Sequence, residues 1–203
     1  TGNLTATVTQ TDGDHPNIST SGLANNIKRY FTLTPGGSLT GGTFSGTYNF
    51  AAADVPGGAT TANFVVRKYA SSAWSATTVG TRTSTSTQAS AISLGSVVSN
   101  YAIGEPGTLV IATHPADVTV CQGANTSFTS SATQTPSYST PIVVWEVSTN
   151  GGGSWTRISN GGVYSGATTG TLTITGATTG MDTYQYHAIF TDLNASVTSN
   201  AAI

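Results

Sequence analysis

Apolar residues recur at every second position along most of this chain. Leu4, Ala6 and Val8 alternate with threonines, and Phe44 and Tyr48 share one face of a later segment. Alternation with a period of two is typical of strands that bury one face. No stretch of ten or more residues carries apolar positions at helical spacing together with a recognisable cap. The sequence therefore predicts an all-β protein.

A glycine- and proline-rich run divides the chain into two halves. After Ile103 the sequence reads Gly104-Glu105-Pro106-Gly107, and proline has no amide proton to give to a sheet. We expect this run to break any strand and to mark the domain boundary. The prediction is one antiparallel β-sandwich over residues 1–106 and a second over residues 107–203. The second half carries about seven apolar segments in about 100 residues, which is the usual count for a sandwich.

Charge is scarce, and this excludes several classes of partner. Only 7% of the residues are charged, the formal net charge is -2, and Lys and Arg together number 6. Binding to phosphate backbones or to anionic membrane surfaces needs clustered basic residues. No apolar run approaches the 18 residues of a membrane span. We therefore expect no nucleic-acid partner and no membrane insertion.

Residue usage also bears on the compartment. Few Lys and Glu beside abundant Thr, Ser and Gly favour a secreted protein, extracellular or at a cell surface. The single cysteine, Cys121, excludes a disulfide within the chain. We expect it to be a small buried hydrophobe, with a bond to another copy as the alternative. No charged and apolar leader stands at Thr1, which favours a mature or excised piece.

The second half resembles an immunoglobulin-like domain. Trp145 stands where the core tryptophan of strand C is expected. The stretch Asp182-Thr183-Tyr184-Gln185-Tyr186 is similar to the strand-F pattern, with Tyr184 at the position of the tyrosine corner. Tyr186 then occupies the position that usually holds a cysteine.

The same resemblance places Ser130 at the strand-B partner of that missing cysteine. The inter-sheet disulfide is thus absent at both ends. What the resemblance implies is an immunoglobulin-like sandwich without its disulfide, held by packing of Trp145, Tyr186 and Phe128.

A narrower resemblance covers nearly the whole chain. Residues 145–155, Trp-Glu-Val-Ser-Thr-Asn-Gly-Gly-Gly-Ser-Trp, and residues 114–123 look like the Ig-like repeats of large secreted proteins of Bacteroidota. The first half resembles a domain that precedes such repeats in proteins exported by the type IX secretion system. Its marks include Gly13-Asp14-His15-Pro16 and Asn63-Phe64-Val65-Val66-Arg67-Lys68-Tyr69. This resemblance implies a stalk, adhesin or spacer without catalysis. No C-terminal sorting domain of that pathway is found, so we expect a processed subunit or part of a longer product.

Candidate chemistry is sparse. The eight acidic residues are scattered as singles, and His15, His114 and His187 fall in separate segments. Catalysis needs a nucleophile with a base, or two carboxylates a few ångströms apart. We therefore predict that the chain is not an enzyme and has no catalytic residues and no cofactor.

A calcium site is the alternative to that cofactor-free prediction. Asp12 and Asp14 are close in sequence, and Asp54 would join them if the two loops converge. Calcium takes six or more oxygen ligands, and local turns explain both loops without a metal.

Aromatic residues in polar loops suggest a second kind of site. Tyr138 and Tyr164 lie among polar residues and could stack on sugar rings. They are our candidates for glycan contact, with host or environmental glycans as the ligand.

The terminal segments carry the main functional hypothesis. Exposed strand edges recruit other strands unless Lys, Glu or Pro block them, and this chain has few charges. We predict a structural subunit of an extracellular fibre that self-associates head to tail with copies of itself. An adhesin or glycan-binding module, or an appendage of a secreted hydrolase, is the alternative. The residues predicted to make the self-association contact are Leu4, Ala6, Val8, Val197, Ala201 and Ile203.

Overall fold

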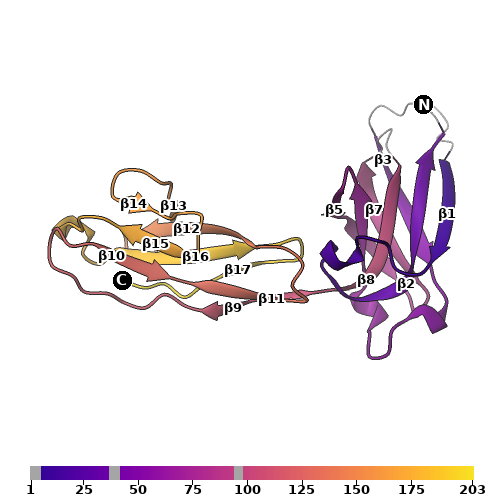
Figure 1. Cartoon of the computed structure of the whole chain (residues 1–203), viewed down its shortest axis with the longest axis horizontal. Coiled ribbons are helices and arrows are strands. Elements are labelled where there is room, and N and C mark those ends of the chain that lie inside the picture. The colour runs from indigo at the N-terminus through magenta and orange to yellow at the C-terminus, as the bar shows by residue number, and fades with distance from the viewer. Residues whose placement is uncertain (1–5, 37–41, 94–97) are drawn as a thin grey trace. The chain divides into compact units, whose positions relative to one another are not determined.

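The computed structural model describes residues 6–36, 42–93 and 98–203. The chain forms two compact units, Thr1–Gly107 (unit 1) and Thr108–Ile203 (unit 2), drawn in Figure 1. Within the described ranges the regular structure is antiparallel β-sheet, interrupted only by short 3₁₀ turns. The prediction of an all-β chain built from antiparallel sheets is confirmed. The 3₁₀ turns are η1 (Ile18–Thr20), η2 (Ala52–Asp54), η3 (Thr61–Asn63) and η4 (Thr179–Met181).

Unit 1 is a sandwich of a five-stranded sheet and a three-stranded sheet. The larger sheet has the order β1 (Ala6–Asp12), β2 (Leu23–Pro35), β8 (Ser99–Pro106), β4 (Val65–Ala70), β5 (Ala73–Ala76). The smaller sheet has the order β3 (Thr43–Asn49), β7 (Ser86–Ser93), β6 (Thr78–Arg82). The core between them includes Ile27, Phe31, Phe64, Val66 and Ile103.

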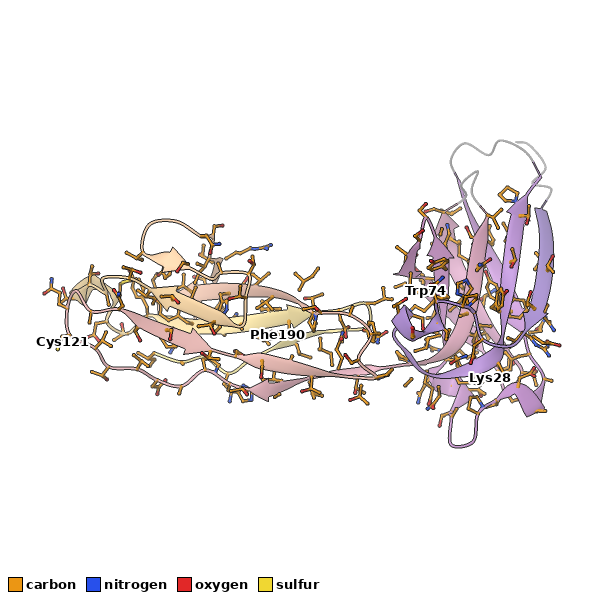
Figure 2. All side chains as sticks on the ribbon, in the orientation of Figure 1. Lys28, Trp74, Cys121 and Phe190 are labelled. Carbon is orange, nitrogen blue, oxygen red and sulfur yellow. The ribbon has the colours of Figure 1, made fainter. Side chains whose placement is uncertain are left out.

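The outer face of the larger sheet carries a second, smaller cluster. Val65 alternates with the core residues Phe64 and Val66, so it packs outward with Leu23 and Ala102. The segment that follows β1 supplies His15, which is 3% exposed. Its ring lies about 5 Å from the rings of three aromatic residues, Tyr30, Tyr69 and Trp74. Trp74 is labelled in Figure 2.

The run 104–107 breaks the strand later than predicted, at Gly107 between β8 and β9. β8 continues through Pro106, and the division between the units falls after Gly107. A Cβ at position 104 would collide with the backbone of Asn25, so glycine there permits close approach of β2. The Glu105 carboxylate accepts hydrogen bonds from Asn25 Nδ2 at 2.7 Å and from the Thr60 amide at 2.8 Å. These bonds lower the pKa of Glu105.

Unit 2 contains nine short strands in three hydrogen-bonded groups. The largest has the order β13 (Thr156–Arg157), β12 (Ile142–Ser148), β16 (Gln185–Thr191), β17 (Ser196–Thr198). A second has the order β10 (Thr126–Thr129), β15 (Thr171–Ile174), β14 (Tyr164–Ser165), and β11 (Ser131–Thr135) pairs with β9 (Thr108–Thr113). Buried residues from all three groups meet in one core, and Phe190 in Figure 2 belongs to it.

Trp145 lies at the centre of this core, as predicted. It is 0% exposed, and its indole Nε1–H donates a hydrogen bond of 2.8 Å to the Thr169 carbonyl. Phe128 and Tyr186 are also buried, and their rings stack with centroids 4.8 Å apart. Burial together with the Tyr164 hydroxyl raises the pKa of Tyr186, so its hydroxyl stays neutral.

Phe128 stacks on Tyr186, which is the packing that the resemblance implies. Ser130 separates β10 from β11 and donates its hydroxyl proton to the Thr113 carbonyl at 2.8 Å. Burial still alternates across it, because Phe128 and Ser130 are buried while Thr129 and Ser131 are exposed. Tyr184 precedes β16 and is half-buried, packed against the core of unit 2.

Substitutions of Trp145 test the separation of the two cores. Trp145→Phe leaves the Thr169 carbonyl without its donor and is expected to lower the unfolding free energy of unit 2 by ~1–3 kcal/mol. Trp145→Ala also opens a cavity and is expected to cost ~3–5 kcal/mol. Differential scanning calorimetry would show one transition moving while the transition of unit 1 stays in place. Equal shifts of both transitions would contradict the assignment of independent cores.

Candidate functional site: two open sheet edges

An inward-facing residue of unit 1 is left uncovered. β1 pairs with β2 so that Val8 stands opposite Leu33 and Gln10 stands opposite Phe31. Directly opposed residues in an antiparallel pair share one face of the sheet. Phe31 belongs to the core between the sheets, so Val8 points toward the same layer. Nevertheless Val8 is 60% exposed.

The reason is a difference in the number of strands. Five strands face three, and β3 is the edge of the smaller sheet on this side. A groove of about 270 Å³ lies beneath β1 and beside β3. We call it the unit 1 groove; it is lined by Val8, Gln10, Phe31, Leu33, Phe44, Tyr48 and their neighbours in β3, with Tyr101. Every one of these described residues is uncharged, and burial raises the pKa of Tyr48 and of Tyr101.

An arginine holds β1 in place at the far end of the strand. Arg29 Nε lies 3.2 Å from Asp12 Oδ1, and Arg29 Nη2 lies 3.4 Å from Asp54 Oδ2. The end of β1, which carries Asp12, and η2, which carries Asp54, therefore do converge, but on a guanidinium.

Asp14 is directed elsewhere. Its carboxylate lies 2.7 Å from Lys28 Nζ and accepts a hydrogen bond of 2.7 Å from Asn26 Nδ2. Although burial opposes it, these contacts lower the pKa of Asp14. Among the described residues, no group of three or more His, Cys, Asp and Glu side chains could hold a metal ion. The two carboxylates predicted as calcium ligands thus each have a protein cation as partner.

Unit 2 has an open edge of its own. The Val118 amide donates to the Ile203 carbonyl at 2.8 Å, and Ile203 donates its own amide to Asp117 Oδ1 at 2.9 Å. Residues 118–122, which we call the edge segment, continue past this contact. Within residues 98–203, neither Thr119 nor Val120 makes a backbone hydrogen bond. Figure 1 shows the C-terminus beside this segment.

The edge segment borders a second groove. This unit 2 groove has a volume of about 300 Å³ and lies between the edge segment and the residues that precede β16. Phe128, Ile174, Tyr184 and Tyr186 contribute its apolar surface. Asp182 is the one charged residue in its described lining.

Cys121 lies in the edge segment and is exposed. The prediction of a buried cysteine is wrong, because this part of the chain pairs with no strand and covers no core. Figure 2 shows it at one end of unit 2.

The residues predicted for self-association have different positions. Leu4 lies outside the described residues, and Ala6 is the first residue of β1. Ala201 is exposed and Ile203 is 47% exposed, whereas Val197 packs in part against the core. Val8 and Ile203 therefore border the two open edges.

The predicted glycan contacts are used within the protein. The Tyr138 hydroxyl accepts a hydrogen bond of 3.0 Å from Asn194 Nδ2. Burial alone would raise the pKa of Asp192, but hydrogen bonds from Tyr138 and Gln134 lower it. The Tyr164 hydroxyl lies 3.2 Å from that of Tyr186. Glycan contact by Tyr138 and Tyr164 stays a prediction.

A stacked cluster on the largest sheet of unit 2 escaped sequence reasoning. His187 Nε2 lies 3.0 Å from Glu146 Oε2, and the Trp155 ring stacks on the imidazole at 3.8 Å. Cross-strand pairing of Glu146 with His187 explains the contact. The sequence contains no local signal for it, because 41 residues separate the two partners.

His15 gives unit 1 a dependence on pH. Its Nδ1 accepts a hydrogen bond from the Asn17 amide at 3.1 Å, and its Nε2 lies 2.8 Å from Asn100 Nδ2. Burial lowers the pKa of His15 below its ordinary value of 6.5.

Acid is therefore expected to weaken unit 1. The unfolded chain binds a proton at His15 near pH 6.5 while the folded unit does not, so stability is full above that pH. The stability of unit 1 falls as the pH drops toward the pKa of His15 in the folded unit, and it then levels off. Urea unfolding between pH 8 and pH 5 measures this slope, and the His15→Gln variant should lose it. An unchanged slope in that variant would show that other groups cause the loss.

Comparisons with known proteins find similarity only among solved structures. No protein-family model and no curated protein matches the chain. A chimeric titin Z1Z2-Z1Z2 tandem is 13% identical, with 89% of this chain and 90% of that chain covered, at a TM-score of 0.34. The N-terminal four Ig domains of Dscam1 isoform 7.44 are 10% identical, with 98% of this chain and 69% of that chain covered, at a TM-score of 0.38. Titin domains I67-I69 are 10% identical, with 100% of this chain and 88% of that chain covered, at a TM-score of 0.36.

All three TM-scores lie below 0.5, so the function proposed below rests on the residues of this chain. None of the described segments is a helix long and apolar enough to cross a membrane.

Proposed function

We propose that this chain is a non-catalytic structural subunit of an extracellular bacterial fibre or surface filament. Its copies join head to tail when a strand is added at an open sheet edge. The observation that carries this proposal is Val8, which faces the layer between two sheets and is still 60% exposed. A strand added beside β3 would cover it.

The energy of such an addition comes from two sources. Covering Val8, Leu33 and Phe44 removes apolar surface from water, worth up to ~1.5–3 kcal/mol for each side chain that becomes fully buried. The free edge of β3 would gain main-chain partners, as in other cases of strand addition.

No charged residue in β3 opposes pairing with another strand. β3, Thr-Phe-Ser-Gly-Thr-Tyr-Asn, has no charged residue and no proline. These are the residues that natural sheets use to block their edges. The formal net charge of -2 adds little long-range repulsion between copies. A surface with few charges is therefore suited to association with other copies.

The non-catalytic and extracellular parts of the proposal have separate support. Tyrosines are the titratable residues that line the unit 1 groove, and they are neutral at physiological pH. The resemblance to secreted repeat proteins supports an extracellular location, where stalks and adhesion modules are built from tandem β-sandwiches.

Sedimentation velocity of the whole chain over a range of concentrations tests the proposal. Oligomers are expected to grow with concentration, and electron microscopy of the concentrated sample should show filaments. Val8→Lys should weaken association at least tenfold, since ~1.4 kcal/mol corresponds to that factor and less than one buried valine supplies it.

Val110→Lys is the matched control. Val110 is 55% exposed in β9 of unit 2 and lines neither groove. Its substitution should leave association unchanged. A chain that stays monomeric at high concentration would refute the proposed function.

A further inference from the structure

We infer that the edge segment of one copy docks in the unit 1 groove of the next copy and pairs with β3. This inference rests on the proposed function and names the two surfaces that would meet. In the edge segment, the backbones of Thr119 and Val120 make no hydrogen bond within residues 98–203, and the unit 1 groove has room for a strand.

The edge segment presents apolar side chains to solvent. Among the described residues, the exposed large hydrophobics number seven, and Val118, Val120 and Ile203 are three of them. They gather at one edge, whereas the others are scattered over both units. Residues 118–122 read Val-Thr-Val-Cys-Gln, a composition that favours strands. A patch of this kind on a chain with few charges indicates a contact surface.

The two surfaces match in length. Residues 118–121 precede the turn at Gln122 and would span about 13 Å when extended. β3 has seven residues and forms one wall of the groove over most of its length. Residues 118–121 are therefore short enough to lie along β3.

They also match in charge. The described lining of the unit 1 groove and the five residues of the edge segment contain no charged side chain. Moving an unpaired charge into an apolar groove is costly, so the groove selects a neutral strand. By contrast, β13 carries Arg157 and β1 ends at Asp12, which makes these edges poorer partners.

The symmetry of the contact decides whether the copies form a closed dimer or a longer assembly. Docking of unit 2 onto unit 1 uses two different surfaces, so every added copy leaves one groove and one edge segment free. Such a contact extends into an open chain of copies, or into a ring where the rotation between copies closes. Pairing of two edge segments with each other would close at a dimer instead.

Disulfide trapping distinguishes these arrangements, because Cys121 lies in the edge segment and is the chain's single cysteine. The exposed Thr47 in β3 lines the groove. The Thr47→Cys variant is concentrated and oxidised with diamide, which takes up two protons and two electrons for each disulfide formed. Non-reducing electrophoresis should then show a ladder of dimers, trimers and larger species that dithiothreitol removes.

Two control variants isolate the contact. Ser75→Cys places the second thiol on β5, at the opposite edge of the larger sheet, and should give about tenfold less trimer because no binding raises the local concentration. Thr47→Cys combined with Cys121→Ser should give no species larger than a dimer. Circular dichroism checks that each variant is folded.

A double-mutant cycle gives a second readout without cysteines. Val8→Ala and Val120→Ala should each weaken association, and together they should weaken it by less than the product of the two factors. Independent effects would overturn the inference.

The failures of the two proposals are distinguishable. If wild-type oxidation gives abundant Cys121-linked dimers and Thr47→Cys gives no ladder, edge segments pair with each other and the inference is wrong. If copies associate in the ultracentrifuge but are not trapped, another segment fills the groove, and only the inference fails. If the chain is monomeric, both fail.

Discussion

The unmet hydrogen-bonding capacity of strand edges is the constraint on which this structure depends. Each interior strand of a sheet is hydrogen-bonded to a neighbour on both sides. An edge strand has a row of unpaired backbone amides and carbonyls along one side, which another strand can bind. Most β-sandwich proteins blunt such edges with charge. With 7% charged residues, this chain cannot do so along all its edges. Its few charges are used at selected points, and the remaining edges stay open.

The position of those charges supports this view. Arg29 joins Asp12 and Asp54, which fixes the end of β1 against its neighbours. Asp14 is paired with Lys28, and Glu105 ties β8 to Asn25 and Thr60. None of these residues lines the unit 1 groove. The described lining of the groove is therefore free of charge, which suits the strand addition proposed for it.

The sequence predicted features that depend on residues close along the chain. It did not predict features that depend on the pairing of segments far apart in the chain. Alternation placed Phe44 and Tyr48 on one face, and both pack in the core of unit 1; the position of Trp145 followed from its local motif. Exposure of Cys121 depends on whether another strand covers residues 118–122, which no local pattern reveals. The glycine at 104 serves a close approach to Asn25, and only the pairing of β2 with β8 shows this.

The same limit applies to the candidate site. Val8 was identified from its alternation, yet its importance comes from a mismatch between five strands and three, a property of the assembled sandwich. A closed sandwich would have buried Val8 and left no reason to invoke a partner. Because β1 is held by Arg29 at one end and by seven register pairs along β2, it cannot fold inward to cover the groove itself. Among the described residues of unit 1, none covers Val8, and the proposed neutral strand of another copy would do so at a low cost in desolvation.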